Sequence, residues 1–484
     1  MEVDRLNFKV PEPTWARLGF NTPPDEKTSG KGVGIVILDQ VNSNGEFNYL
    51  GDRIHQISVE DDLSVSCCHF NTYESDRWDE SEHGANVLRL LTHPPFHYKD
   101  NDYIGLAPAA TYYILSEGDP LKLRRGIKWL IERKDEFNIK IILNLLVPRV
   151  ELFQNTSVDP YVIAFQSAIE ANVLIIAANG NSRAHNNLHP IDFFTIGGYN
   201  DNGSANFAEY EPHPVVPWGR NGDGHMRPDL LAPFTYLPVK LVNNKLSFFS
   251  GSCGSSAIVA GLCANILSRF TEIDLNTFKS ILINSGLTLK NSENPASIIQ
   301  AEKAIELISN EFVPVGQANT IKIRISDATK SINSKDPVKR ALALTNLIEE
   351  KKCSREMLWT FIFDESPIVR KNALIAIGKS LDILEKERLW IIFHNEKDST
   401  GVREALLYAL LENADSTELD RWVLLTDDTN IDIRLCVKLY LERFFENAPK
   451  LAHISINVPE VIAENSEAIK EWYIRHKKIN EIFF

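Results

Sequence analysis

A run of small residues, GSCGSSA at positions 251–257, constrains the fold of this chain more than any other stretch. An apolar run typical of a strand, Lys245–Phe249, leads into it, and a helix of small apolar residues is predicted from Ala257 onward. The segment therefore predicts a tight turn between a strand and a helix, with Cys253 in the turn. Unpaired N–H groups and the helix dipole favour negative charge at such a position, which suits a thiolate nucleophile.

Three upstream segments place further polar side chains at the ends of predicted elements. Asp39 ends the apolar run VGIVIL, Asn181 closely follows the apolar run VLII, and His83 opens a predicted helix. Continuous apolar runs of this length are typical of buried parallel strands. Functional sites of open α/β sheets form at the carboxyl ends of such strands. The sequence therefore predicts that these three residues meet Cys253 at one edge of a sheet.

Four blocks in this order resemble the subtilisin-like (subtilase) peptidase family. They are VGIVILD ending at Asp39, HGANVLRLL from His83, AANGNS around Asn181, and GSCGSSAIVAG around Cys253. Three linking segments are also similar: GLAPAA from Gly105, RPDLLAP from Arg227, and ASIIQAEKAI from Ala296. The resemblance covers about residues 25–310. It implies an α/β fold with a subtilisin-like, doubly wound parallel sheet.

The resemblance also implies a role for each residue. Asp39 orients His83 and stabilises its imidazolium, and His83 acts first as general base and then as general acid. Cys253 attacks the scissile carbonyl carbon, while its backbone N–H and the side-chain amide of Asn181 form the oxyanion hole. The implied function is an endopeptidase that cleaves a protein or peptide substrate through a covalent acyl-enzyme. No cofactor and no metal are expected.

Several residues depart from the family pattern. Cys253 occupies the usual serine position, and the longer carbon–sulfur bond shifts the adduct relative to an oxyanion hole built for serine. Cysteine–histidine–acid sets nevertheless hydrolyse peptides on other folds. Ala257 replaces the usual proline, and Gln40 and Val41 replace a Thr-Gly pair. Pro148 replaces a glycine that lines the substrate groove, and proline removes a backbone N–H there.

These departures leave three alternatives open. The domain is a degenerate, non-cleaving scaffold that binds other proteins, or Cys253 replaces a natural serine by mutation, or the neighbouring Ser252 is the nucleophile. The last requires a one-residue slip of the alignment and is disfavoured. A buried cysteine alone is usually a small hydrophobic residue, but here three partner blocks accompany it.

The last third of the chain has a different pattern. Trp359, Trp390 and Trp422 recur at spacings of 31 and 32 residues, each in an amphipathic helix. A second helix opens after each of them on a branched apolar residue followed by arginine, as in Val369–Arg370. Two helices per unit of this length indicate an α-solenoid. The pattern is similar to HEAT-type repeats, with the tryptophans in the core between repeats and a charged cap helix at 464–484.

The expected organisation has four parts. These are an N-terminal extension at 1–24, a subtilisin-like peptidase domain at 25–310, a linker at 311–326 and an all-α HEAT-like repeat domain at 327–484. The surface of a solenoid binds other proteins, so a partner or regulator is expected on the repeats.

The composition of the chain argues against several classes of partner and location. The chain has 484 residues, with 51 Lys and Arg against 65 Asp and Glu, and the net charge of −14 argues against a nucleic-acid partner. Six cysteines show no disulfide framework, and Cys67-Cys68-His69 lacks a second ligand pair with zinc spacing. The sequence shows no apolar signal region and no membrane-spanning run. A cytoplasmic protein without a membrane partner is therefore expected.

Overall fold

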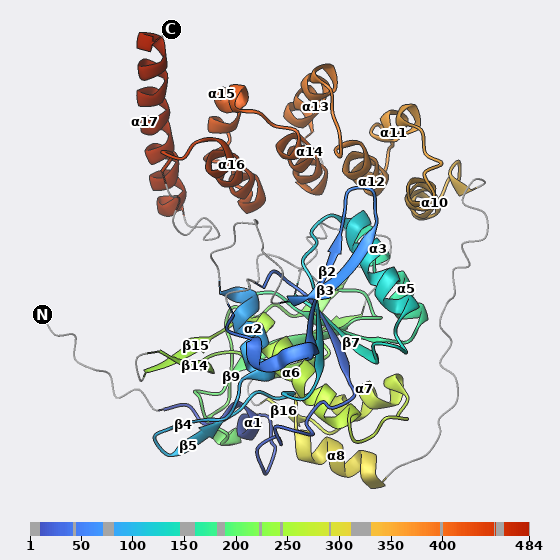
Figure 1. The fold of residues 1–484 in the computed structure, drawn as a ribbon, viewed down its shortest axis with the longest axis vertical. Helices are drawn as coiled ribbons and strands as arrows, with labels where there is room; N and C mark the ends of the chain where they lie inside the picture. The colour runs from blue at the N-terminus through green and yellow to red at the C-terminus, as the bar shows by residue number, and fades with distance from the viewer. Residues whose placement is uncertain are drawn as a thin grey trace, which may run out of the picture. The chain divides into compact units, whose positions relative to one another are not determined.

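The structure is a computed structural model of the chain. It describes residues 10–41, 45–70, 82–145, 160–181, 189–221, 225–242, 245–289, 292–310, 331–396, 400–449, 451 and 459–483. The chain divides into two compact units, Met1–Ile323 and Arg324–Phe484 (Figure 1).

The first unit combines a large sheet, three short hairpins and helices. Its strands are β1 (Gly34–Leu38), β2 (Ile54–Val59), β3 (Val65–His69), β4 (Phe96–Tyr98), β5 (Asn101–Tyr103), β6 (Thr111–Leu115), β7 (Ile139–Asn144), β8 (Leu174–Ala178), β9 (Phe194–Asn200), β10 (Glu211–Pro212), β11 (Gly219–Arg220), β12 (Met226–Arg227), β13 (Leu230–Pro233), β14 (Leu237–Val242), β15 (Lys245–Phe249), β16 (Leu287–Thr288) and β17 (Ser297–Ile298). Its α-helices are α1 (Thr14–Arg17), α2 (His83–Thr92), α3 (Pro120–Glu132), α4 (Pro160–Ile163), α5 (Gln166–Glu170), α6 (Ser252–Leu267), α7 (Leu275–Asn284) and α8 (Ala301–Asn310).

The order of strands in the main sheet is β16-β17-β13-β9-β8-β7-β1-β6-β2-β3, with β10 paired to β9. The strands from β17 to β2 in this order all run parallel, whereas β3, β10 and β16 are antiparallel to their neighbours. The chain winds from β1 to β2 and β6 on one side, and then to β7, β8, β9 and β13 on the other. The predicted doubly wound parallel sheet is confirmed. Because the chain continues on opposite sides of β1, the carboxyl end of β1 is the topological switch point of the sheet.

The central strand shows why these residues form a buried parallel sheet. Every residue of β1 is buried, and successive side chains point to opposite faces. Ile35 and Ile37 join the core under α2 and α6, whereas Val36 and Leu38 join the core under α3, α4 and α5. Helices therefore cover both faces of the sheet. Helix α6 is buried along its whole length, which its small side chains permit.

Residues 10–24 of the expected N-terminal extension pack within this unit. Arg17 at the end of α1 is fully buried and forms an ion pair with Asp201, Nε to Oδ2, at 2.6 Å. Its guanidinium also donates to the backbone carbonyls of Thr235 and Tyr236, at 2.7 and 2.9 Å. The start of the described chain is thereby fixed to the loop that precedes β14.

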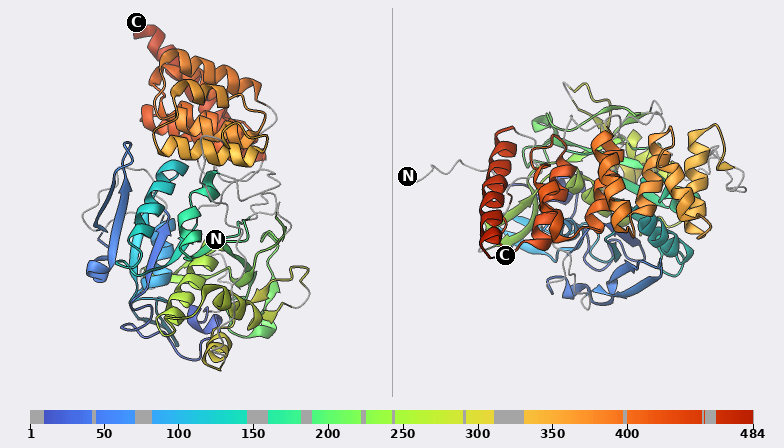
Figure 2. Two further views of the ribbon diagram at one scale, coloured as in Figure 1. Left: turned by 90° about the vertical axis from the view of Figure 1, so that its right-hand side faces the viewer. Right: turned by 90° about the horizontal axis from the view of Figure 1, so that it is seen from above.

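The second unit is helical in every described element. Its α-helices are α10 (Pro337–Glu349), α11 (Arg355–Phe361), α12 (Pro367–Ile377), α13 (Ile383–Asn395), α14 (Thr400–Glu412), α15 (Leu419–Val423), α16 (Ile431–Phe444) and α17 (Pro459–Phe483). Helices α10, α12, α14 and α16 pack in succession, and α11, α13 and α15 each pack on the helix that follows. The row of helices is visible in Figure 2.

Contacts between successive helix pairs repeat along this unit. Trp390 and Trp422 are buried and meet edge to face, with ring centroids 5.5 Å apart. An arginine one turn into a helix pairs with an acid of the next repeat in Arg340–Asp364, Arg370–Glu396 and Arg403–Asp428. The predicted paired helices are found, but only Trp390 and Trp422 are buried in a core, whereas Trp359 is half-buried. The likeness to HEAT-type repeats stays a prediction. No helix in the described ranges is long and apolar enough to cross a membrane.

Candidate active site

The loop after β1 and the first residue of α2 bring Asp39 and His83 together. The ring Nδ1 of His83 donates to Asp39 Oδ2 at 2.7 Å, and the Gln40 N–H donates to Asp39 Oδ1 at 2.8 Å. Both carboxylate oxygens therefore accept a hydrogen bond, which fixes the orientation of the acid. The other ring nitrogen of His83, Nε2, is left available to a different partner.

Gly84 makes this close approach possible. A Cβ atom at position 84 would lie 2.1 Å from the carbonyl oxygen of Gln40, in the residue after Asp39. Any side chain there would push the start of α2 away from the end of β1. The His-Gly pair is therefore explained by packing as well as by chemistry, since the glycine lets His83 reach Asp39.

The turn before α6 presents Cys253 to this pair. Gly251 adopts φ 117°, a left-handed conformation that favours glycine, and its N–H donates to the Phe234 carbonyl at 2.9 Å. Helix α6 then begins at Ser252, earlier than the predicted start at Ala257. Cys253 consequently lies in the first helical turn, where backbone N–H groups lack intrahelical partners.

His83 and Cys253 are close enough to interact directly. Burial by itself lowers the pKa of His83. The hydrogen bonds to Asp39 and to the Cys253 side chain outweigh this effect and raise the pKa to about 11. The ring of Phe249 meets the His83 ring edge to face, with centroids 5.3 Å apart, and limits its rotation. The predicted acid, base and nucleophile thus meet at one site, because the imidazole of His83 interacts with both Asp39 and Cys253.

Asn181 lies beside the nucleophile turn. Its side-chain carbonyl oxygen accepts from the N–H and the hydroxyl of Ser252, at 2.7 and 2.9 Å. The residue as a whole is exposed, so its amide group is placed at the surface of the site. Ser252 is fully buried, and its hydroxyl also accepts from the Gly180 N–H at 3.1 Å. These contacts give Ser252 a role in holding the turn and argue against its use as a nucleophile.

The raised pKa makes a prediction about the charge of His83. The ring is expected to stay protonated from pH 6 to pH 9, because its folded pKa of about 11 lies far above the ordinary value of 6.5. The stability that this proton contributes is present below pH 6.5 and is lost as the pH rises toward 11. NMR titration of histidine-labelled protein measures the charge, and replacing Cys253 by serine should lower the midpoint. A His83 midpoint near 6.5 would contradict the assignment.

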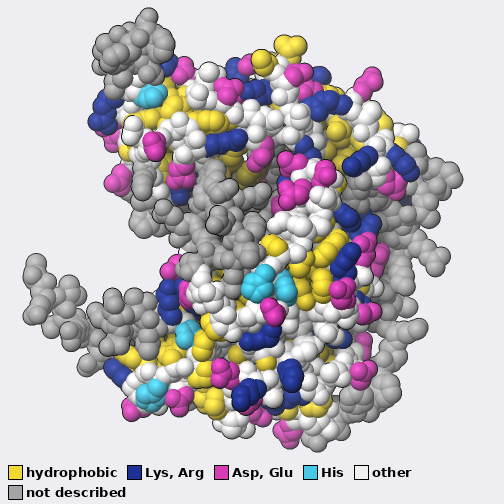
Figure 3. Space-filling view, viewed as in Figure 1, with side chains coloured by type: hydrophobic (Ala, Val, Ile, Leu, Met, Phe, Trp, Pro, Cys, Tyr) yellow, Lys and Arg dark blue, Asp and Glu magenta, His cyan; other side chains and the backbone are white. Residues whose placement is uncertain are grey.

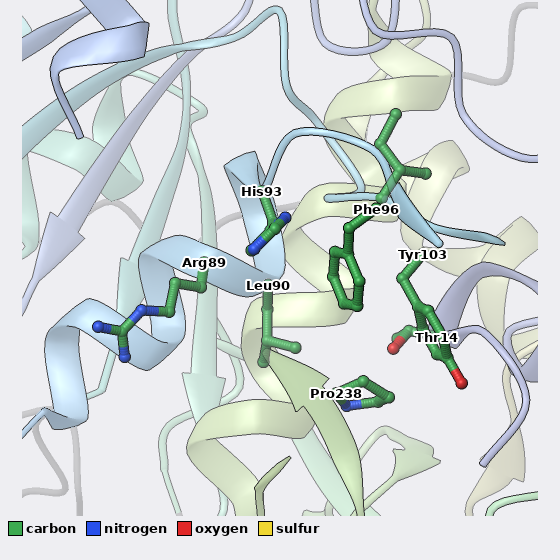
Figure 4. Close-up of a pocket in the computed structure, with 8 residues that line it drawn as sticks. Thr14, Arg89, Leu90, His93, Phe96, Tyr103 and Pro238 are labelled. Carbon is green, nitrogen blue, oxygen red and sulfur yellow. The ribbon is translucent and has the colours of Figure 1, made fainter. Parts of the chain in front are cut away.

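Other predicted features lie away from the site. Cys67, Cys68 and His69 lie on β3, and no group of three metal-ligating side chains occurs among the residues that the structure describes. Pro148 lies outside the described residues. A small cavity lined by residues of α1, α2, the β4–β5 hairpin and β14 does not contain the four candidate residues (Figure 4). Sequence reasoning missed the contact of Phe249 with His83, for which no short motif exists.

Comparison with known proteins agrees with this fold. Residues 71–304 match the Subtilase family, and this range contains His83, Asn181 and Cys253. No curated protein sequence matches the chain. Three of the solved structures similar to it follow. They are a mutant of the protease domain of PatA (21% identity, 60% of this chain and 98% of that chain covered, TM-score 0.43), Sphericase (17%, 61% and 99%, 0.46) and the CspB protease of Clostridium perfringens (14%, 59% and 96%, 0.45).

The family match covers a large part of the first unit. The match bears out the expected resemblance to this family over residues 71–304. The matched range ends before the second unit begins. The catalytic role of each residue remains a prediction, as does the binding role of the repeats.

Proposed function

We propose that this protein is a peptidase of subtilisin-like fold that uses Cys253 as its nucleophile. One observation carries the proposal: His83 contacts Asp39 through Nδ1 and interacts with the Cys253 thiol, at the N-terminus of a buried helix. A histidine held between a carboxylate and a nucleophile is the arrangement that acyl transfer requires. His83 and Cys253 lie in the range that matches the Subtilase family, which supports a peptidase function.

In the proposed acylation step, the attacking form is the thiolate of Cys253 beside protonated His83. The Cys253 sulfur attacks the carbonyl carbon of the peptide, and the carbonyl oxygen becomes an oxyanion that accepts hydrogen bonds from the Asn181 amide and from the first turn of α6. The carbon–nitrogen bond then breaks, and His83 gives its proton to the leaving nitrogen. A thioester and a free amine result, and His83 is left neutral.

In the proposed second step, water releases the acyl group. Neutral His83 takes a proton from a water molecule, whose oxygen attacks the thioester carbon. The carbon–sulfur bond breaks, the carboxylic acid leaves, and the thiolate–imidazolium pair is restored. Asp39 keeps the ring oriented in both steps and stabilises its positive charge. The sum is hydrolysis of one peptide bond, with no co-reactant except water.

The proposal also covers the cellular environment of the protein and the partner that its helical repeats bind. The described residues contain no disulfide, which fits a reducing, cytoplasmic environment that keeps a thiol nucleophile active. The helical repeats are proposed to bind the substrate or a protein regulator, because stacked helix pairs offer a long continuous surface. Acidic and basic side chains are interspersed on the face shown in Figure 3, over the described residues. This mixture suits a protein partner better than a nucleic acid.

The alternative is a non-cleaving scaffold, which is favoured by the presence of cysteine at the usual serine position. A thiol-directed acylating probe separates it from the proposal. At pH 7 the probe is expected to add one acyl group at Cys253, and His83→Ala should slow this labelling by about tenfold or more, because no imidazolium then supports the thiolate. Intact mass and peptide mapping measure the adduct. Labelling at the same rate in both proteins would reject the peptidase and support the scaffold.

A further inference from the structure

We propose that Lys240, through its ion pair with Glu82, is a positioning residue that fixes the β14–β15 hairpin against α2 and thereby aligns His83 with Cys253. The inference rests on the proposed function, since it assigns a supporting residue to that site. The two residues lie 158 positions apart in the sequence, and no motif connects them.

The hairpin touches His83 and the residue that follows Cys253. On β15, Phe249 packs edge to face against the His83 ring. The same residue pairs with Leu237 of β14, and both side chains close on Gly254, the residue after Cys253. A Cβ at Gly254 would lie 2.6 Å from the end of the Leu237 side chain. A shift of the hairpin would therefore move the base and the nucleophile turn relative to each other.

A line of four charged side chains joins the hairpin to α2. Lys240 on β14 donates to both carboxylate oxygens of Glu82, at 2.9 Å each, and Glu82 directly precedes His83. Glu82 also accepts from Arg89 of α2 at 3.0 Å. Arg89 in turn makes a two-pronged contact with Glu46, with both distances 2.5 Å. The line thus runs from the loop after Asp39, across α2, to the hairpin that leads into Cys253.

Apolar contact supports the same interface. Strand β14 packs against α2, and Leu90 of α2 and Pro238 of β14 line one small cavity between them. Figure 4 shows Leu90 and Pro238 among the residues that line this cavity. The apolar contact holds the two elements together, and the Lys240–Glu82 pair fixes how far the hairpin slides along the helix.

Exposure indicates that the pair acts on alignment more than on stability. The Glu82 side chain is 55% exposed and that of Lys240 is 22% exposed. Ion pairs with this degree of exposure contribute little to the free energy of unfolding. Misplacement of reacting groups by about 1 Å can nevertheless cost roughly a hundredfold in rate. Loss of Lys240 should therefore change reactivity while the protein stays folded.

The test compares Lys240→Met with Lys240→Arg, which retains the charge. Lys122→Met is the matched control, because Lys122 of α3 also pairs with an acid, Asp61, in the same unit. Acylation of Cys253 at pH 7 is measured together with the melting temperature and the NMR titration of His83. Lys240→Met is expected to label about tenfold more slowly, with an altered His83 midpoint and unchanged melting. The arginine variant and the control should stay close to wild type.

Two results would overturn the inference. Wild-type labelling in Lys240→Met would show that the pair does not align the site, and an equal loss in Lys122→Met would show a general effect of removing an ion pair. The His83→Ala variant is measured in parallel. If it labels as fast as wild type, the proposed function itself fails, whereas dependence on His83 without dependence on Lys240 rejects only the positioning role.

Discussion

Replacing Cys253 by alanine is expected to abolish peptide cleavage, with a loss on the order of 10⁴-fold, because no other described group is placed to attack the substrate. The nearest hydroxyl, that of Ser252, is fully buried and bonded to Gly180 and Asn181. The measurement is hydrolysis of peptide thioesters, esters and amides by wild type and variant, with mass spectrometry of the acyl-enzyme. Equal cleavage by both proteins would remove Cys253 from the mechanism.

Cys263→Ala is the matched control for this experiment. Cys263 lies on the same helix, α6, but it is fully buried, and burial raises its pKa well above the ordinary range. Its thiol is therefore expected to be inert, so cleavage and labelling should stay close to wild type. Loss of activity in this control would indicate damage to the helix instead of loss of the nucleophile.

Cys253→Ser addresses the origin of the cysteine. If the site is adapted to sulfur, the serine variant should cleave peptides about a hundredfold more slowly, because the shorter carbon–oxygen bond moves the attacking atom away from His83. A neutral hydroxyl also needs a neutral histidine as its base, whereas the pKa of His83 is raised to about 11 with Cys253 present. A gain in amide cleavage would instead show that Cys253 occupies the place of a serine.

Much of the fold could be predicted because its central strands are continuous apolar runs. The strands before Asp39 and Asn181 are buried on both faces, so neither needs polar alternation, and their ends are marked by polar residues. The start of α6 was predicted too late. Ser252, Cys253 and Gly254 have weak helix propensity, and it is the burial of the whole helix that makes them helical.

The geometry of the site was less accessible to sequence reasoning. Which atoms of Asn181 face the turn depends on its bonds to Ser252, and these form only after β8 and α6 have packed. The same holds for Lys240 and Glu82, whose pairing depends on the hairpin meeting α2. In the second unit, by contrast, Trp359 donates to Glu385 and Trp390 donates to Glu418, at sequence distances of 26 and 28 residues. A regular spacing was therefore enough to predict its helices.

Gly84→Ala is expected to separate the catalytic pair while most of the fold persists. The added Cβ would lie 2.1 Å from the Gln40 carbonyl oxygen, a backbone atom that no rotamer change can move, so α2 must shift by about 1 Å. The hydrogen bond from His83 to Asp39 should lengthen, and acylation of Cys253 should fall roughly a hundredfold. Overpacking of this kind costs about 1–3 kcal/mol, so the melting temperature should drop without loss of folding.

Gly118→Ala separates this effect from the general cost of replacing a glycine. Gly118 lies in the loop between β6 and α3, and a Cβ there would meet no atom within 4 Å. Labelling of Cys253 and melting should both stay close to wild type in this control. NMR titration of His83 completes the comparison, because a weaker bond to Asp39 lowers the His83 pKa in Gly84→Ala alone. Full labelling of Gly84→Ala, with an unchanged His83 midpoint, would show that contact between α2 and β1 does not set the alignment of His83.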